Sequence, residues 1–206
     1  MTSILKADTI QDAAGNNIIN ENANTITIGA SGDTITIPSG ATISNSGTAT
    51  GFGGITEADQ YRLTASITSD TDPISSNLER VDDATFSKIG TGMSVSSGIF
   101  TFPSIGLYYV NAQGQMFPAS GDNLYIGTYV SSNSGGAYDQ VIQTNFGSAG
   151  GQQGGGVNNC TFVNVTNAST FRIKFAVGSF AVGSEVNGDT NYNFTNFTFI
   201  RLGDSQ

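Results

Sequence analysis

The stretch from residue 98 to residue 110 most constrains what this chain can fold into. Phe100 and Phe102 alternate with small or polar residues, which gives the first half one apolar face. Pro103 has no amide hydrogen and ends that half, while Gly106 supplies a turn position that tolerates unusual backbone angles. An aromatic-rich run then begins at 107. The stretch therefore predicts a strand, a tight turn and a second strand.

The composition extends this β prediction to the whole chain of 206 residues. Thr, Ile, Val, Phe and Tyr dominate between Gly and Asn clusters, and no sustained apolar pattern has helical spacing. Charged residues make up only 11%, well below the roughly 25% of ordinary soluble domains. Such neutral polar surfaces are common where a protein sits against copies of itself. We expect an all-β chain with one sandwich domain and a short appendage.

Three segments can be separated: a polar leader at 1–23, a repeat with its linker at 24–54, and a globular head at 55–206. The phrase Thr-Ile-Thr-Ile occurs at 25–28 and again at 34–37, with a weaker third copy at 41–44. Alternation places the isoleucines on one face, which strands this short cannot bury within one chain. The repeat predicts a trimeric β-shaft. The alternative is a meander packed on the head.

Within the head, strands are expected at 61–67, 93–95, 108–117, 124–130, 141–146, 160–165, 171–177 and 192–202, with 78–81 and 85–89 as short strands or strand-like loops. The final strand, at 192–202, is apolar on both faces and should lie centrally in its sheet. Cys160 precedes an apolar run, so we expect a small buried residue.

Catalytic and cofactor chemistry is largely excluded by composition. The chain has no histidine and one cysteine, which rules out histidine-based triads, histidine-ligated zinc and a structural cysteine zinc site. The glycine-rich run at 150–156 has no lysine and predicts a mobile loop rather than a phosphate cradle. The sequence predicts a protein that is not an enzyme and has no cofactor.

Charge and hydropathy also limit the partners. A net charge of −9 disfavours nucleic acid and anionic membranes. No apolar run approaches the roughly 20 residues of a membrane span, so no membrane insertion is expected.

Paired carboxylates were considered as cation or glycosidase sites. Asp70 and Asp72 flank a turn and are candidates for a bound calcium ion, with solvated turn residues as the favoured alternative. Asp82 and Asp83 are adjacent and are expected to point to opposite faces. Glu185 and Asp189 form a third pair.

Tyrosines and amides are the better signal for binding. Stacking on tyrosine combined with hydrogen bonds from Asn, Asp and Gln suits carbohydrate recognition, although the same tyrosines are equally candidates for filling a trimer axis. The candidate surface residues are Tyr125, Tyr129, Tyr138, Asn133, Asp139, Gln140, Gln152 and Gln153.

The spacing of the 98–110 stretch resembles the signature of C1q-like domains, relatives of the tumour-necrosis-factor jelly roll. The residues that carry it are Gly98, Phe100, Pro103, Gly106, Tyr108 and Val110. The late strand at 171–175 and the aromatic end at 194–200 resemble the same family. The resemblance implies a jelly-roll head, covering about 55–203, that assembles as a compact homotrimer. The collagen stalk of the family is absent, and the repeat takes its place.

The leader, from Met1 to Asn16, resembles the start of virion structural proteins of marine tailed phages, and the repeat phrases are similar to shaft segments of their fibres. This resemblance implies a particle-surface protein: a short tail fibre attached to other virion proteins through 1–23, with the head binding a host glycan or protein. The main alternative is a capsid head fibre or decoration protein. A polysaccharide depolymerase and a secreted ligand are weaker alternatives.

Overall fold

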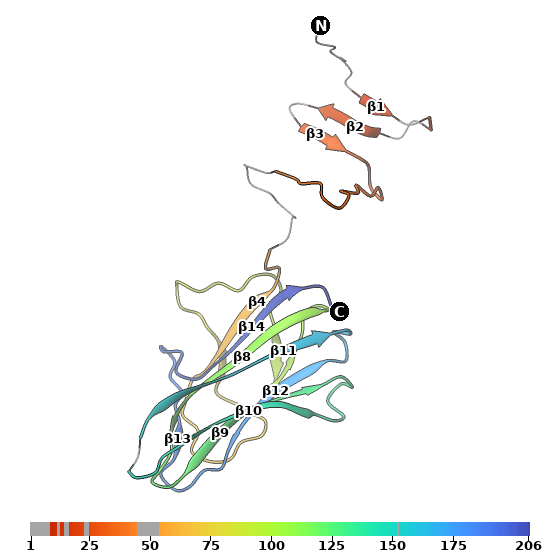
Figure 1. Ribbon diagram of the computed structural model, residues 1–206. Coiled ribbons are helices and arrows are strands. Elements are labelled where there is room, and N and C mark those ends of the chain that lie inside the picture. The colour runs from red at the N-terminus through yellow and green to blue at the C-terminus, as the bar shows by residue number, and fades with distance from the viewer. Residues whose placement is uncertain (1–8, 12, 15–16, 23–24, 45–53, 152) are drawn as a thin grey trace. The chain divides into compact units, whose positions relative to one another are not determined.

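The computed structural model describes residues 9–11, 13–14, 17–22, 25–44, 54–151 and 153–206 (Figure 1). The chain divides into two compact units, Met1–Phe52 and Gly53–Gln206, and the second is called the head below. Every helix or strand assigned in the described residues is a β-strand. The predicted all-β class is therefore confirmed.

The N-terminal unit is a small antiparallel sheet in the order β1-β2-β3. Its strands are β1 (Thr9–Gln11), β2 (Asn17–Asn22) and β3 (Thr25–Ile28). The register places Ile10 opposite Ile19, and Ile19 opposite Ile28, so the three side chains form one row across the sheet. All three are exposed. The unit leaves its apolar row without cover from its own described residues.

The repeat is only partly built as predicted. Its first copy coincides with β3, but 34–37 and 41–44 form no strand. Alternation of Thr and Ile sets which face each side chain takes, but it supplies no neighbouring strand to complete a hydrogen-bonded ladder. The leader before Thr9, and most of the linker, lie outside the described residues.

The head consists of two antiparallel sheets (Figure 1). The five-stranded sheet runs β10-β9-β12-β7-β6 and the six-stranded sheet runs β11-β8-β14-β4-β5, with β13 pairing β8. The five-stranded sheet contains β6 (Ser94–Ser96), β7 (Ile99–Thr101), β9 (Asn123–Ser131), β10 (Asp139–Gly147) and β12 (Arg172–Gly178). The six-stranded sheet contains β4 (Ala58–Leu63), β5 (Leu78–Arg80), β8 (Gly106–Phe117), β11 (Gly155–Val165), β13 (Glu185–Val186) and β14 (Asn196–Gly203).

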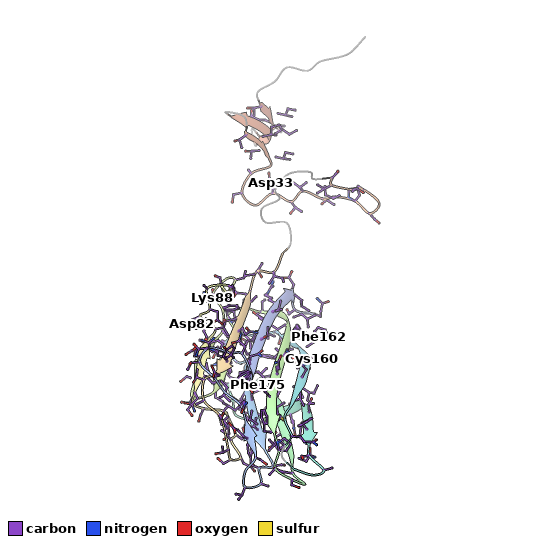
Figure 2. All side chains as sticks on the ribbon, turned by 90° about the vertical axis from the view of Figure 1, so that its left-hand side faces the viewer. Asp33, Asp82, Lys88, Cys160, Phe162 and Phe175 are labelled. Carbon is purple, nitrogen blue, oxygen red and sulfur yellow. The ribbon has the colours of Figure 1, made fainter. Side chains whose placement is uncertain are left out.

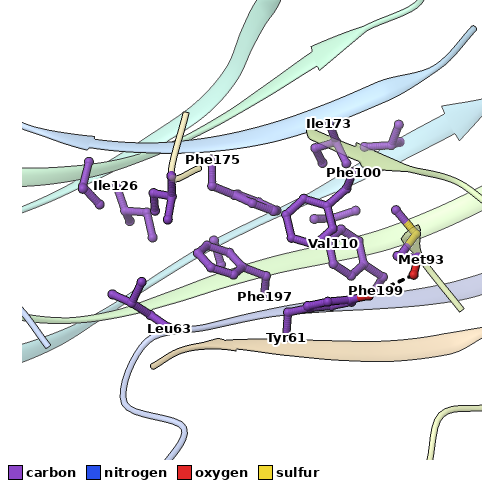
Figure 3. Packing of buried hydrophobic residues seen from close by; sticks show 14 of the residues in the cluster. Tyr61, Leu63, Met93, Phe100, Val110, Ile126, Ile173, Phe175, Phe197 and Phe199 are labelled. Carbon is purple, nitrogen blue, oxygen red and sulfur yellow. Dashed lines mark hydrogen bonds between the residues drawn. The ribbon is translucent and has the colours of Figure 1, made fainter. Parts of the chain in front are cut away.

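Aromatic rings from both sheets fill the space between them (Figure 3). Phe175 of the five-stranded sheet stacks on Phe197 of the six-stranded sheet, with ring centroids 4.3 Å apart. Phe100 packs edge-on against Phe175 at 5.7 Å and against Tyr61 at 5.2 Å. Burial of each ring removes about 150–250 Å² from water, so this cluster holds the two sheets together.

Two strand predictions have informative outcomes. The last strand, β14, lies between β8 and β4, which confirms its central position. The first strand of the head was placed wrongly at 61–67, because β4 spans Ala58–Leu63. Beyond Leu63 the regular pairing stops and isolated contacts follow: the Thr64 N–H donates to the Asn77 carbonyl next to the Leu63–Leu78 pair, and Ile67 forms a single bridge with Val186.

The 98–110 stretch forms β7, a turn and the start of β8. Gly98 has a φ of 78°, and a Cβ there would lie 2.2 Å from the Ile74 carbonyl oxygen. Glycine is therefore required at this position, because the backbone has a positive φ and a side chain would clash with the Ile74 carbonyl oxygen. Phe100 and Tyr108 point into the core, and the Tyr108 hydroxyl donates to the Ser104 carbonyl at 3.0 Å. Pro103 lies in the turn, and Gly106 begins β8 against Arg201.

Candidate functional site

The outward face of the six-stranded sheet carries no charged side chain along β8, β11 and β14, apart from Arg201 near the end of β14. Alternation along each strand sends small and apolar residues such as Val110, Val163 and Phe199 into the core. The opposite positions face outward. They are Leu107, Tyr109, Asn111, Gln113, Gln115 and Phe117 of β8, Asn158, Cys160, Phe162 and Asn164 of β11, and Thr198, Ile200 and Leu202 of β14. This set is called the uncharged face below.

An aromatic row crosses the middle of the uncharged face. The strand register sets Phe162 opposite Tyr109, and Tyr109 opposite Ile200. The Tyr109 and Phe162 rings lie 6.0 Å apart in an edge-to-face arrangement. Phe162 is 65% exposed and Leu202, further along β14, is 52% exposed. A single exposed apolar side chain is ordinary, but apolar side chains that adjoin one another on a surface mark an interaction site.

Cys160 lies one row away from these rings (Figure 2). The expectation that it is buried was wrong, because its thiol is exposed on the uncharged face. The neighbouring positions Asn159 and Val163 have the parity that faces the core, so Cys160 faces outward. Burial, together with a hydrogen bond to Cys160, raises the pKa of the Tyr109 phenol.

A cavity of about 410 Å³ opens at one end of the same sheet. Its lining is formed by Gln113, Gln115, Phe117, Gly154, Gly155, Gly156, Asn193 and Phe194. The Asn193 Oδ1 atom is buried with no hydrogen-bond partner among the described residues. Sequence reasoning did not find this cavity, because its lining comes from three segments far apart in the chain.

The predicted tyrosines lie on the other sheet. Tyr125 and Tyr129 are on β9, and Tyr138 precedes β10. The Lys174 ammonium of β12 lies 5.1 Å from the Tyr129 ring centroid and 4.8 Å from that of Tyr138. The same ammonium pairs with the Asp72 carboxylate at 2.6 Å. The structure thus brings Tyr129 and Tyr138 together around a lysine that the sequence reasoning did not select.

Burial and neighbouring groups shift the pKa values of Tyr129 and Tyr138 in this cluster. Burial raises the pKa of Tyr129, and its interactions with Tyr125 and Asp72 raise it further. Burial also raises the pKa of Tyr138, opposed by the positive charge of Arg172. All three tyrosines are half-buried.

The remaining predicted binding residues are dispersed. Asn133 is used within the β9–β10 loop, where its Oδ1 accepts hydrogen bonds from the Ser131 hydroxyl at 2.7 Å and the Ala137 N–H at 3.0 Å. Asp139 is exposed at the start of β10. Gln153 is exposed in the loop before β11, at the other end of the head, and Gln152 lies outside the described residues.

The carboxylate pairs are engaged in different contacts. Asp70 Oδ1 accepts the Phe180 N–H at 3.0 Å, whereas Asp72 pairs with Lys174. Within the described ranges, no group of three or more His, Cys, Asp or Glu side chains is placed to hold a metal ion. The Asp70–Asp72 pair thus has no third carboxylate beside it.

The expectation for Asp82 and Asp83 was wrong. Both reach the guanidinium of Arg62, which also binds Glu79 with its Nε at 2.8 Å. They converge because 82–83 is not part of a strand, so the alternation rule does not apply. Arg62 is only 2% exposed. Sequence reasoning missed this cluster, since Arg62 sits in an otherwise ordinary strand.

The loops at the end of the head opposite the C-terminus are joined by another residue that the sequence did not single out. Asp122 Oδ2 accepts the Ala181 N–H at 2.9 Å and the Ser184 hydroxyl, while the Ser148 N–H donates to the Asp122 carbonyl at 2.9 Å. Burial alone would raise the pKa of Asp122, but these hydrogen bonds to its carboxylate outweigh burial and lower it. The Asp122 carboxylate therefore links its own loop to the loop at 179–184, and the Asp122 backbone carbonyl adds a bond to Ser148.

Comparisons with known proteins give a fold and no close relative. No family model matches the chain, and no curated protein matches it. Among solved structures, murine APRIL at pH 5.0 aligns with a TM-score of 0.54 at 10% identity, covering 71% of this chain and 98% of APRIL. Eiger TNF from S. frugiperda aligns with a TM-score of 0.56 at 12% identity, covering 72% of this chain and 94% of Eiger. Together with the two antiparallel sheets, these matches show that the head has a TNF-like jelly-roll fold.

Proposed function

We propose that this chain is a non-enzymatic, homotrimeric structural protein of a phage particle, a short tail fibre whose jelly-roll head mediates adhesion to the host. The uncharged face is the observation that carries the trimer. It sets the exposed Phe162 in one row with the half-buried Tyr109 and Ile200, with no charged residue in the row. Depletion of charge with enrichment of aromatic residues is typical of the centre of a protein interface.

The N-terminal unit supports the same assembly. Ile10, Ile19 and Ile28 form an exposed row, and Ile26, Ile35, Ile37 and Ile43 are exposed as well. A three-stranded sheet without a covered face is marginal in water. Three copies held together by their heads would bring three such units to high local concentration, and their isoleucines would then be buried against one another.

The placement on a phage particle rests on the leader and repeat phrases, which resemble virion proteins and fibre shafts. Attachment through residues 1–23 would leave the head on the particle surface. The small size of the N-terminal unit, whose described strands are three to six residues long, favours a second candidate, a capsid head fibre or decoration protein. Labelling the C-terminus and locating the label on virions by electron microscopy separates tail from capsid.

The trimer is tested by placing a charge on the uncharged face. Phe162→Glu buries a carboxylate in the proposed interface without touching the core, so we expect the trimer to dissociate to monomers in light scattering. Val182→Glu is the matched control, because Val182 is fully exposed in the loop before β13. The control variant should remain trimeric. A trimeric Phe162→Glu protein would contradict the proposed interface.

Within the described residues, no helix is long and apolar enough to cross a membrane. The proposed partners are further copies of this chain, other virion proteins and a host surface molecule. Nucleic acid, membrane insertion and a cofactor have no part in the proposal.

A further inference from the structure

The outward side of the five-stranded sheet holds an ordered group of phenols. Tyr125, Tyr129 and Tyr138 are called the tyrosine platform below. A Cβ built on Gly178 would lie 2.6 Å from the Tyr125 hydroxyl and 2.7 Å from its Cε1 and Cζ atoms. Gly178 is the cross-strand neighbour of Tyr125. The Tyr125 side chain therefore leans across the sheet and covers a glycine, rather than standing out from the surface.

Tyr129 lies down on the sheet in the same way. A Cβ on Gly127 would approach the Tyr129 Cε2 atom to 2.9 Å. Ala176, the cross-strand neighbour of Gly127, is completely buried although it shares the outward parity of Lys174. The floor of the platform is thus made of residues with little or no side chain, and the rings take the place of the missing atoms.

Other contacts hold the rings in position before any ligand arrives. The Lys174 ammonium lies against both Tyr129 and Tyr138, and Asp72 balances its charge. Rings that are already fixed lose little conformational entropy when a ligand binds. The charges of Lys174 and Asp72 cancel at the centre of the platform. At its edge, Arg172 acts on Tyr138 and the exposed Asp139 follows Tyr138, so charges of both signs are present there and neither sign prevails.

Amide side chains run alongside the platform on β10. Gln140 Nε2 donates to Gln143 Oε1 at 2.6 Å, and Gln143 Nε2 donates to Asn145 Oδ1 at 3.0 Å. Gln140 is the cross-strand neighbour of Tyr129, and Asn145 that of Tyr125. The chain of bonds leaves Gln140 Oε1 as an acceptor and the Asn145 Nδ2 hydrogens as donors, with no partner among the described residues. Donors and acceptors therefore flank the rings along their length.

We propose that the tyrosine platform, with Gln140 and Asn145, binds a neutral polysaccharide. A pyranose ring offers an apolar C–H face to an aromatic ring and hydroxyl groups to amides, which is the combination found here. The rings and amides extend along the paired strands from Tyr125 and Asn145 to Tyr129 and Gln140, so an extended chain can contact more of them than a single sugar. This inference rests on the proposed adhesive function and assigns it a surface and a ligand class.

The probe is a printed array of neutral homopolysaccharides of glucose, mannose, galactose and N-acetylglucosamine beside acidic polysaccharides, tested with the full chain. We expect binding to at least one neutral glycan. Tyr125→Ala should weaken that binding at least tenfold, while Tyr125→Phe keeps the stacking ring and most of the binding. Gly178→Ala retains every tyrosine but displaces the Tyr125 ring, and should also weaken binding at least tenfold. Tyr192→Ala, which removes an exposed ring elsewhere, should leave binding unchanged.

Light scattering on each variant separates the two proposals. A trimeric wild type that binds no neutral glycan, binds only acidic ones, or binds equally well after Tyr125→Ala overturns the platform and leaves the trimer standing. A monomeric wild type whose neutral-glycan binding depends on Tyr125 and Gly178 supports the platform and overturns the trimer.

Discussion

The rings of Tyr109 and Phe162 lie edge to face on neighbouring strands, 6.0 Å apart, on a face of the head that has no charge around them. Their contact links the exposed edge strand β11 to β8, and the register continues the row to Ile200. In a single chain this row faces water. In the proposed trimer it forms the centre of the interface, and each prediction about assembly depends on it.

Cys160 reports on whether that face is covered. Its thiol is exposed in the single chain, one row from the Tyr109–Phe162 pair. We expect it to react with iodoacetamide at least about tenfold more slowly in the native protein than in Phe162→Glu, because subunit packing excludes the reagent. A Cys160→Ser/Val182→Cys protein, whose thiol sits on an exposed loop, provides the reference rate. Equal rates for Cys160 and the loop thiol would contradict coverage of the face.

Phe175 tests the aromatic core. It stacks on Phe197 at 4.3 Å and also contacts Phe100 and Phe199. Phe175→Ala should lower the free energy of unfolding by about 3–5 kcal/mol, through lost burial and the cavity left behind. Phe175→Leu should cost less, since it keeps much of the volume. Urea unfolding at one fixed protein concentration measures both, because assembly makes stability concentration-dependent. A loss below about 1 kcal/mol for Phe175→Ala would contradict this packing.

Arg62 and Asp82 should differ sharply although they are partners. Arg62→Met leaves Glu79, Asp82 and Asp83 facing one another without a cation. Their side chains are 36%, 74% and 42% exposed, so water screens part of the repulsion, and the loss should be about 2 kcal/mol. Asp82→Asn should cost less than about 1 kcal/mol, because the Asp82 side chain is 74% exposed and Arg62 keeps two carboxylates. Urea unfolding of the two variants gives the comparison. Similar losses would show that Arg62 is not the centre of the cluster.

Asp122 makes the stability of the head depend on pH in the acidic range. Its pKa is lower in the folded protein than in the unfolded chain, so its contribution is complete above the unfolded value of about 3.9 and disappears as pH falls through the folded value. Asp122→Asn should lower Tm by about 2–4 °C at pH 7, and the difference from wild type should shrink toward pH 3. Thermal unfolding across this range tests it. A difference independent of pH would contradict the role of the ionised carboxylate.

Local patterns predicted the parts of this fold that local residues determine. Alternation located β9 and β12, and the two-sided apolar character of 197–202 correctly placed β14 in the middle of its sheet. The β4 boundary was missed because it depends on where its partner strands begin, β5 at Leu78 and β14 at Asn196, which are distant in sequence. The second copy of the repeat was missed for a related reason: a strand needs a neighbour, and alternation does not name one.

The candidate sites depended still more on tertiary contacts. Three tyrosines were selected from their chemistry, but Lys174, which joins two of them, lies more than 35 positions away in the chain. The roles of Arg62 and Asp122 follow from partners brought together by folding. The alternation along β11 could have predicted that Cys160 faces outward, since Val163 and Val165 on the same strand mark the core-facing positions. Its apolar neighbours in sequence suggested burial instead.

The mass of the intact protein in solution tests the central claim most directly. Size-exclusion chromatography with light scattering on the full chain should give three chains of 21.3 kDa, about 64 kDa, across a range of concentrations. A single peak at the mass of one chain would contradict the trimer and the interface assigned to Tyr109 and Phe162.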